Sequence, residues 1–259
     1  MAEAQVALDE THVAEADAPI FEAQGVSKSY GHVEALIDVD FQIYPNEVVG
    51  LLGDNGAGKS TLIKIMSGVV HPDSGSFLRA GKPININSRR ASEAAGIETI
   101  YQDIALVGSM SIMRNIFAGR ELVNKAGFLR MKEMRDTAME ILDKYVRIAG
   151  ITSPELMVEE LSGGQQQAVA IARAVHFKHD MLLLDEPTSA LSVRETEKVL
   201  GFMTELASTG VSCVFVTHNL YQASQVCHRF VVMAHGRVIK VARKEETTIE
   251  ELTELLVTH

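Results

Sequence analysis

The sequence lacks the features that mark membrane-spanning or disulfide-bonded proteins. Its apolar runs are far shorter than the roughly 20 residues needed to cross a bilayer, and no secretory n-region and h-region opens the chain. Its two cysteines, Cys213 and Cys227, form no metal or redox spacing and lie in apolar stretches. We therefore expect a reducing compartment and two buried structural thiols, and any membrane-spanning role must fall to another subunit.

Positive charge is also scarce. The chain has 24 Lys and Arg against 34 Asp and Glu, which gives a formal net charge of −10, and the basic residues form no block. Because nucleic-acid binding depends on neutralising phosphates, nucleic acid is not an expected partner. The 259 residues, 46% hydrophobic and 22% charged, suit one large core or a core plus a subdomain. Residues 1–18 are acidic and alanine-rich, which predicts a disordered tail.

A phosphate-binding loop lies in the first quarter of the chain. The stretch that fits G-x-x-x-x-G-K-[ST] is Gly53-Asp54-Asn55-Gly56-Ala57-Gly58-Lys59-Ser60-Thr61. Its glycines let backbone N–H groups face phosphates, Lys59 adds a positive charge, and the Ser60 hydroxyl can ligate Mg²⁺. An apolar strand over 47–52 precedes the loop, and an amphipathic helix with its apolar residues within 62–66 follows it. The glycine spacing differs from that of a dinucleotide fingerprint, so a nucleotide phosphate site is expected here.

Polar side chains follow two later strands. The apolar run 181–184 ends at Asp185 and Glu186. Asp185 can hold Mg²⁺ through water, and Glu186 can orient and polarise an attacking water. A further apolar strand over 211–217 ends at His218, and this carboxyl edge is where α/β folds usually bind ligands.

Two other features could contact a nucleotide. Residues 161–165 read Leu-Ser-Gly-Gly-Gln, in which Ser162 can cap a helix. Gly163 and Gly164 at the start of that helix expose N–H groups and the positive end of its dipole, which predicts a second anion site. Tyr30, upstream of the phosphate loop, could stack on a base, an attraction of about 1–3 kcal/mol.

The hydrophobic pattern predicts an α/β fold with two additions. Residues 38–43 alternate as a half-buried antiparallel strand, and a hairpin is expected over 77–86. The helix after Ser192 is expected to bury a stripe of Val193, Thr196, Leu200, Met203 and Ala207. We expect a P-loop NTPase core over 19–102 and 176–259, with a mostly parallel sheet, flanking helices and an antiparallel β subdomain. Residues 103–175 form the expected inserted helical subdomain.

In this order and spacing the motifs resemble those of the ATP-binding cassette (ABC) ATPases, over roughly residues 20–240. Tyr30 is similar to the A-loop aromatic residue, residues 53–61 are similar to Walker A, and Gln102 is similar to the Q-loop glutamine. Residues 161–165 match the LSGGQ signature motif. Asp185 and Glu186 resemble Walker B with its catalytic glutamate, and His218 resembles the switch histidine. The resemblance implies catalysis by Glu186, His218 and Gln102, and Mg²⁺ held by Ser60, Gln102 and Asp185. It also implies an ATP-dependent homodimer. In that dimer Ser162, Gly163, Gly164 and Gln165 of one copy cover the γ-phosphate on Lys59 of the other.

One position departs from the pattern, and rival classes remain. The loop after Walker B usually reads Ser-Ala-Leu-Asp, but here it ends in Ser192, so a carboxylate is missing at the expected interface. A guanine-nucleotide switch would need Asn-Lys-x-Asp, and 124–127 lacks the Asp. A soluble ABC-type ATPase of DNA repair or translation is the serious alternative. It usually carries paired cassettes, long coiled-coil insertions or basic surfaces, none of which is seen here, so a transporter subunit is favoured.

Residues 100–103, 114–121 and 158–160 resemble the ATPases of bacterial monosaccharide importers of the ribose and fructose type. The resemblance implies integral membrane permease subunits, indirectly a periplasmic solute-binding protein, and a peripheral position on the cytoplasmic face of the inner membrane. An ABC transporter for a non-sugar substrate is the remaining alternative. The methionines of 103–175 are expected to be core filler or, in the sharper hypothesis, part of a groove for a permease helix, with Met113 in its lining.

Overall fold

The computed structural model describes the chain except residues 1–17, 102–104, 146–150, 178–179, 190 and 259. The expected acidic tail therefore lies almost wholly outside the described residues, and Gln102 lies outside them too. Within the described chain no helix is long and apolar enough to cross a membrane.

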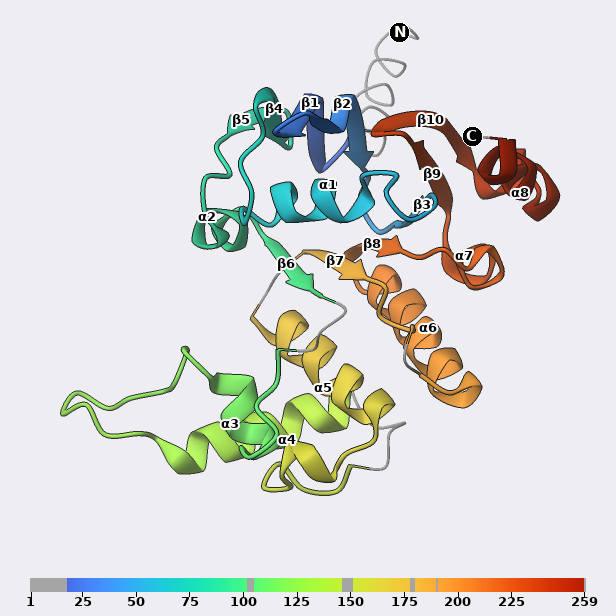
Figure 1. Cartoon of the computed structure of the whole chain (residues 1–259). Coiled ribbons are helices and arrows are strands. Elements are labelled where there is room, and N and C mark those ends of the chain that lie inside the picture. The colour runs from blue at the N-terminus through green and yellow to red at the C-terminus, as the bar shows by residue number, and fades with distance from the viewer. Residues whose placement is uncertain (1–17, 102–104, 146–150, 178–179, 190, 259) are drawn as a thin grey trace, which may run out of the picture.

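Two sheets form the framework of the molecule (Figure 1). The larger has six strands in the order β10 (Arg237–Arg243), β9 (Arg229–Ala234), β3 (Val48–Leu52), β8 (Ser212–Val216), β7 (Met181–Asp185) and β6 (Ile97–Ile100). All neighbours in it are parallel except β10 with β9. The smaller is antiparallel, in the order β2 (Val33–Ile43), β1 (Phe21–Tyr30), β4 (Ser74–Arg79) and β5 (Lys82–Ile84). The predicted α/β core with an antiparallel β subdomain is confirmed.

The large sheet is buried on both faces, as a parallel sheet requires. Along β3, Val49 and Leu51 face one core, and Val48 and Leu52 face the other. The first core contains helix α1 (Lys59–Met66), sandwiched between the two sheets in Figure 1. The second is covered by α5 (Gly163–His176), α6 (Val193–Ser208), α7 (Leu220–Val226) and α8 (Ile249–Thr258). A short helix, α2 (Arg89–Ala94), precedes β6.

A third core forms where α3 (Ile112–Phe117), α4 (Met131–Tyr145) and one face of α5 pack together. Helix α5 serves two cores, because Ala172 faces α3 and α4 whereas Ile171 faces the large sheet. This helical layer lies below the sheet in Figure 1 and ties the signature motif to the body of the molecule.

The pattern of buried side chains corrects two sequence predictions. Val193 is 77% exposed, because it is the first residue of α6 and lies beyond the part that packs on the sheet, whereas the rest of the stripe is buried. Met113 is 1% exposed and packs inside the α3–α4–α5 core, so it cannot line a docking groove. Met134 is also buried, as core filler should be, but Met110, Met131 and Met139 are exposed.

Two local predictions are confirmed. Ala80 and Gly81 have φ of 47° and 72° in the turn between β4 and β5, the two positive values of a type I′ hairpin. Cys213 and Cys227 are free and buried, and burial raises the pKa of the Cys213 thiol to about 12. Both thiols are therefore inert structural groups.

Candidate nucleotide site

The phosphate loop is shaped by glycines that other residues could not replace. It runs from the end of β3 to the start of α1, with φ of +151° at Gly53 and +104° at Gly58. A Cβ on Gly53 would overlap the Met233 carbonyl oxygen, and one on Gly58 would lie 2.7 Å from the Ala35 oxygen. A Cβ on Gly56 would meet nothing within 4 Å. The loop is therefore packed tightly against the protein at Gly53 and Gly58 and open at Gly56.

The turn between β9 and β10 holds the loop from behind. The Gly236 amide donates to the Ala57 carbonyl over 3.1 Å, and the Gly236 carbonyl accepts from the Ile37 amide over 2.8 Å. Residues that are far apart in the sequence therefore fix the loop before any ligand arrives. Such preorganisation lowers the entropic cost of binding.

Lys59 begins α1 and turns back over the loop. Its Nζ donates to the carbonyl oxygens of Gly53 (2.6 Å) and Asp54 (2.9 Å), and the residue is only 6% exposed. Burial lowers the pKa of the Lys59 ammonium, although Glu186, Asp185 and Asp54 oppose that shift. A buried cation bonded only to neutral carbonyls is stabilised by an incoming anion, which suits a phosphate.

Two carboxylates lie where β7 ends. Burial raises the pKa of the Asp185 carboxyl, and repulsion from Glu186 adds to the shift while Lys59 opposes it. Glu186 has a left-handed φ of 49°, an uncommon conformation for a residue with a Cβ. Its amide donates to the Val216 carbonyl over 3.1 Å, and its carbonyl accepts from the Ser189 hydroxyl over 3.1 Å. Strained backbone held by its surroundings, here by β8 and by the turn at Ser189, is typical of functional sites.

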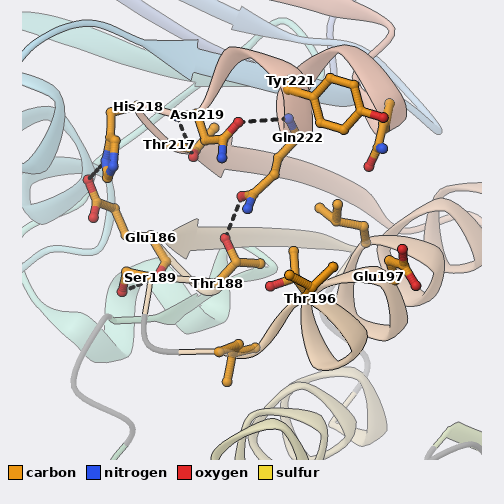
Figure 2. Close-up of a pocket in the computed structure, with 14 residues that line it drawn as sticks. Glu186, Thr188, Ser189, Thr196, Glu197, Thr217, His218, Asn219, Tyr221 and Gln222 are labelled. Atoms are coloured by element: carbon orange, nitrogen blue, oxygen red, sulfur yellow. Dashed lines mark hydrogen bonds and ion pairs between the residues drawn. The ribbon is translucent and has the colours of Figure 1, made fainter.

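His218 meets Glu186 at the edge of the sheet. Its Nδ1 lies 3.1 Å from Glu186 Oε1, as Figure 2 shows. Both residues line a cavity of about 580 Å³ between the amino ends of α6 and α7. The Thr188 hydroxyl donates to Gln222 Oε1 over 2.7 Å in the wall of this cavity. Sequence reasoning missed Thr188 and Gln222, although Thr188 lies only two residues after Glu186.

The Leu-Ser-Gly-Gly-Gln motif starts α5, as expected. Ser162 Oγ accepts from the Gln165 amide over 3.4 Å, and Gln165 Oε1 accepts from the Ser162 amide over 2.9 Å, which completes a capping box. A residue that sequence reasoning did not connect with this motif, Glu195 of α6, reaches it. Glu195 Oε1 accepts from Ser162 Oγ over 2.7 Å and from the Gly164 amide over 3.2 Å. Three residues earlier in the chain, the Ser192 amide also donates to Glu195 Oε2, over 3.1 Å.

The remaining expected residues are exposed to different degrees. Tyr30 ends β1 rather than lying in a loop, is 48% exposed, and has Lys28 Nζ 5.6 Å from its ring centroid. Asp54, Asn55 and Ser60 are exposed, and Thr61 is half-buried.

One chain does not bring the two anion sites together. Helix α1 packs in the core on one face of the large sheet, and α5 packs on the other face (Figure 1). Among the hydrogen bonds and ion pairs that the structure gives for the described residues, none joins 162–165 to 53–61. A site that uses both would need a second copy.

Comparison with known proteins places the chain among transport ATPases. The family model described as ABC transporter matches residues 36–189. The chain is 48% identical to the xylose/arabinose import ATP-binding protein of Sulfolobus acidocaldarius, over 92% of the chain and 93% of the relative. It is 39% identical to the fructose import ATP-binding protein of Rhizobium meliloti, over 91% and 93%. The ribose import ATP-binding protein of Caldanaerobacter subterraneus is 35% identical, and the chain spans 48% of its length.

Solved structures give the same fold. A nucleotide-free ATP-binding cassette of an ABC transporter superposes with a TM-score of 0.78 at 24% identity, and the match covers 92% of this chain and 95% of that one. A dimeric ATP-binding cassette in a post-hydrolysis state with ADP and Pi superposes with a TM-score of 0.71 at 26% identity, covering 86% and 98%.

Proposed function

Because the chain belongs to the ABC transporter family, we propose that it is the ATP-hydrolysing subunit of a membrane importer, and that the imported solute is a monosaccharide. One observation supports ATP hydrolysis: at the carboxyl ends of β3 and β7, buried Lys59 lies near Asp185 and Glu186. His218 contacts Glu186 at the same edge of the sheet. The sugar assignment rests on relatives whose names specify import of xylose and arabinose, fructose or ribose.

The loop 53–61 would bind the phosphates of ATP. Its open face at Gly56 leaves room for them, and Lys59 would exchange its two carbonyl partners for phosphate oxygens. Tyr30, exposed at the end of β1, would stack on adenine. These roles account for the glycines, the buried cation and the exposed aromatic ring together.

The residues beside the loop fit a magnesium ion. Ser60 is exposed at the start of α1, and among the described residues no hydrogen-bond partner is found for the Asp185 carboxylate. The described chain has no cluster of three His, Cys, Asp or Glu that could hold a metal unaided. Mg²⁺ usually takes one or two protein oxygens and completes its shell with phosphates and water, so Ser60 and Asp185 suit it. Gln102, which lies outside the described residues, is the third ligand expected from the sequence. When bound, Mg²⁺ would neutralise phosphate charge.

Glu186 and His218 would handle the attacking water. The Glu186 carboxylate can accept a hydrogen bond from water and orient it towards the γ-phosphate. The strained backbone of Glu186 and its contact with His218 fix the direction of that carboxylate. Proton transfer would therefore depend on Glu186, with His218 and Gln102 as positioning groups.

The active form would be a homodimer with two equivalent sites. Residues 162–165 of each chain would close over the phosphates held by the partner, because α5 and α1 lie on opposite faces of the sheet in one chain. Related cassettes of the same fold have been solved as dimers. The interface is bridged by nucleotide, so the protein without ATP is expected to be monomeric.

A charged groove is the proposed docking site for a permease. A hollow of about 400 Å³ lies between α2, α3, α5 and Ala105. Its polar lining comprises Arg89, Arg120, Arg173, Glu93 and Glu98. Arg173 donates to the Ala105 carbonyl over 3.0 Å and so links α5 to the chain that follows Gln102. A short cytoplasmic helix of the permease bound in this groove would contact α5, the helix that begins at the signature motif. It would also hold this subunit on the cytoplasmic face of the membrane.

Sugar specificity would then lie elsewhere, in a periplasmic binding protein and the permease, and uptake is the test. In cells carrying the gene, Glu186→Gln should lower uptake of one labelled monosaccharide by ~10²–10⁴, the effect of removing a positioned general base. Glu205→Gln, on the exposed face of α6, is the matched control. If every monosaccharide still enters at the parental rate while another solute does not, the importer assignment survives and the sugar assignment fails. Normal uptake of all solutes would refute both.

A further inference from the structure

The carboxylate of Glu195 is held by four hydrogen bonds from the amino ends of two helices, α5 and α6. Its Oε1 accepts from Ser162 Oγ (2.7 Å) and from the Gly164 amide (3.2 Å). Its Oε2 accepts from the amide and hydroxyl of Ser192, over 3.1 and 2.8 Å. All four donors are neutral, and they hold the pKa of the Glu195 carboxyl at about 2, so it remains ionised at any physiological pH. An anion therefore already occupies the amino end of α5.

The packing around this carboxylate is close. A Cβ on Gly164 would lie 2.6 Å from Glu195 Cγ and 2.9 Å from its Cδ. Gly164 is thus small not only to admit a ligand but also because Glu195 fills the space beside it. Ser192 contributes as well, since an Asp at this position would set a second carboxylate against Glu195 Oε2. The serine that departs from the family pattern supplies one of the four donors, a hydroxyl that an ionised Asp could not replace.

We propose that Glu195 is an internal anion that occupies the signature motif of the ATP-free chain and must leave when a phosphate of the partner's nucleotide arrives, so that it sets the ATP concentration at which the dimer forms. This rests on the proposed function, in which residues 162–165 cover that phosphate. Each donor hydrogen of Ser162 Oγ and Gly164 N serves one strong acceptor at a time, and two anions on the same donors repel. On withdrawal from Ser162 and Gly164, the carboxylate keeps the two bonds that Ser192 donates to its other oxygen.

The test compares Glu195→Gln with its parent. Both carry Glu186→Gln so that a dimer, once formed, persists. Glutamine keeps the shape but has no charge, and its single amide oxygen can accept from only one of the two pairs of donors, more weakly than a carboxylate does. The ATP concentration that gives half-maximal dimer in sedimentation velocity should fall about fivefold, and Glu205→Gln on the same helix should leave it unchanged. If Glu195→Gln needs the same or a higher ATP concentration to dimerise, the proposal is wrong and Glu195 only stabilises the fold.

A second measurement reads the contact without nucleotide. Amide hydrogen exchange over 163–166 should speed up in Glu195→Gln and stay at the parental rate in Glu205→Gln. Equal exchange in all three proteins would show that Glu195 does not occupy the motif. If the parent forms no dimer at any ATP concentration, the shared-site model fails and takes this proposal with it. If the parent dimerises and only the Glu195→Gln shift is missing, this proposal alone fails.

Discussion

Individual residues in the nucleotide site are arranged for chemistry at some cost to stability. Asp185 and Glu186 place two carboxylates side by side at the end of β7, and burial with mutual repulsion raises the pKa of Asp185. Lys59 is nearly buried and its pKa is lowered by that burial. The charges of Asp185 and Lys59 are disfavoured in the free fold and become useful when a metal or a phosphate arrives. Functional sites commonly show this trade of stability for activity.

The raised pKa of Asp185 leads to a stability prediction. A carboxyl whose pKa is higher in the folded than in the unfolded chain destabilises the fold fully above the folded-state pKa, and this penalty disappears as the pH falls from that pKa to the unfolded-state value. Asp185→Asn should therefore raise the melting temperature of nucleotide-free protein at neutral pH, by roughly 2–4 °C for a gain of about 1 kcal/mol. The gain should shrink as the pH falls through the raised pKa. Differential scanning calorimetry over a pH series measures it.

The control for this substitution is Asp136→Asn, an exposed residue on α4 that undergoes the same loss of charge. It should leave the melting temperature within about 1 °C, as surface substitutions usually do. A lower melting temperature for Asp185→Asn, or a gain that does not change with pH, would mean that Asp185 is not strained in the free protein.

Sequence predicted the residues that lie in continuous motifs, because loop 53–61 and the strand ends carry their chemistry in adjacent positions. It did not predict contacts between distant positions. Glu195 meets Ser162 across 33 residues, and Thr188 meets Gln222 across 34. Neither contact has a local spacing that a single sequence could reveal. The roles assigned to the motif residues remain predictions, and Gln102 lies outside the described chain.

At the scale of elements, periodicity predicted most strands and helices but not which apolar side chains stay exposed. Val193 belongs to the α6 stripe by spacing, yet the first turn of that helix extends past the sheet. Met113 was expected near a surface groove, but α3 is short and buries it against α4 and α5. Helix ends and short helices are where tertiary packing overrides a repeating pattern.

Because Met113 is buried, a substitution in the charged groove is the better test of permease docking. Ala118 is exposed there, at the end of α3. Ala118→Trp should fill the groove, cut ATP-driven uptake by the assembled transporter about tenfold or more, and leave the ATPase rate of the free protein within about twofold. Uptake in reconstituted vesicles and phosphate release from the isolated chain are the two readouts.

Ala126→Trp is the matched control, an equal change on an exposed turn of the helical layer but outside the groove. It should affect neither readout. If Ala118→Trp transports normally, the permease docks elsewhere. If both variants lose uptake equally, bulk on the helical layer rather than the groove is responsible.

At the scale of the whole molecule, one chain carries a complete set of motifs but cannot assemble them into one site. The phosphate loop belongs to the core between the two sheets, and the signature motif belongs to the helices on the far face. A closed dimer with twofold symmetry would pair each loop with the partner's motif, and both interfaces would then be identical. If the active form is such a dimer, two chains damaged in different motifs should restore activity when they pair.

Mixing Lys59→Ala protomers with Ser162→Arg protomers tests this division of the site. Lys59→Ala removes the cation that holds phosphate, and Ser162→Arg blocks the opposite half, so each variant alone should have almost no ATPase activity. A mixed dimer has one doubly damaged site and one intact site. Random pairing makes half of the dimers mixed, so an equal mixture should recover roughly a quarter of the wild-type rate.

Ser208→Arg, exposed at the far end of α6, replaces Ser162→Arg as the control partner, and it should be active without mixing. Phosphate release measured across a series of mixing ratios should peak at equal amounts. A flat, inactive series from protomers that do exchange would show either that the site is not shared or that one intact site cannot turn over while the other is empty. An ATPase-active Ser162→Arg protein would show that the signature motif does not contribute to the site at all.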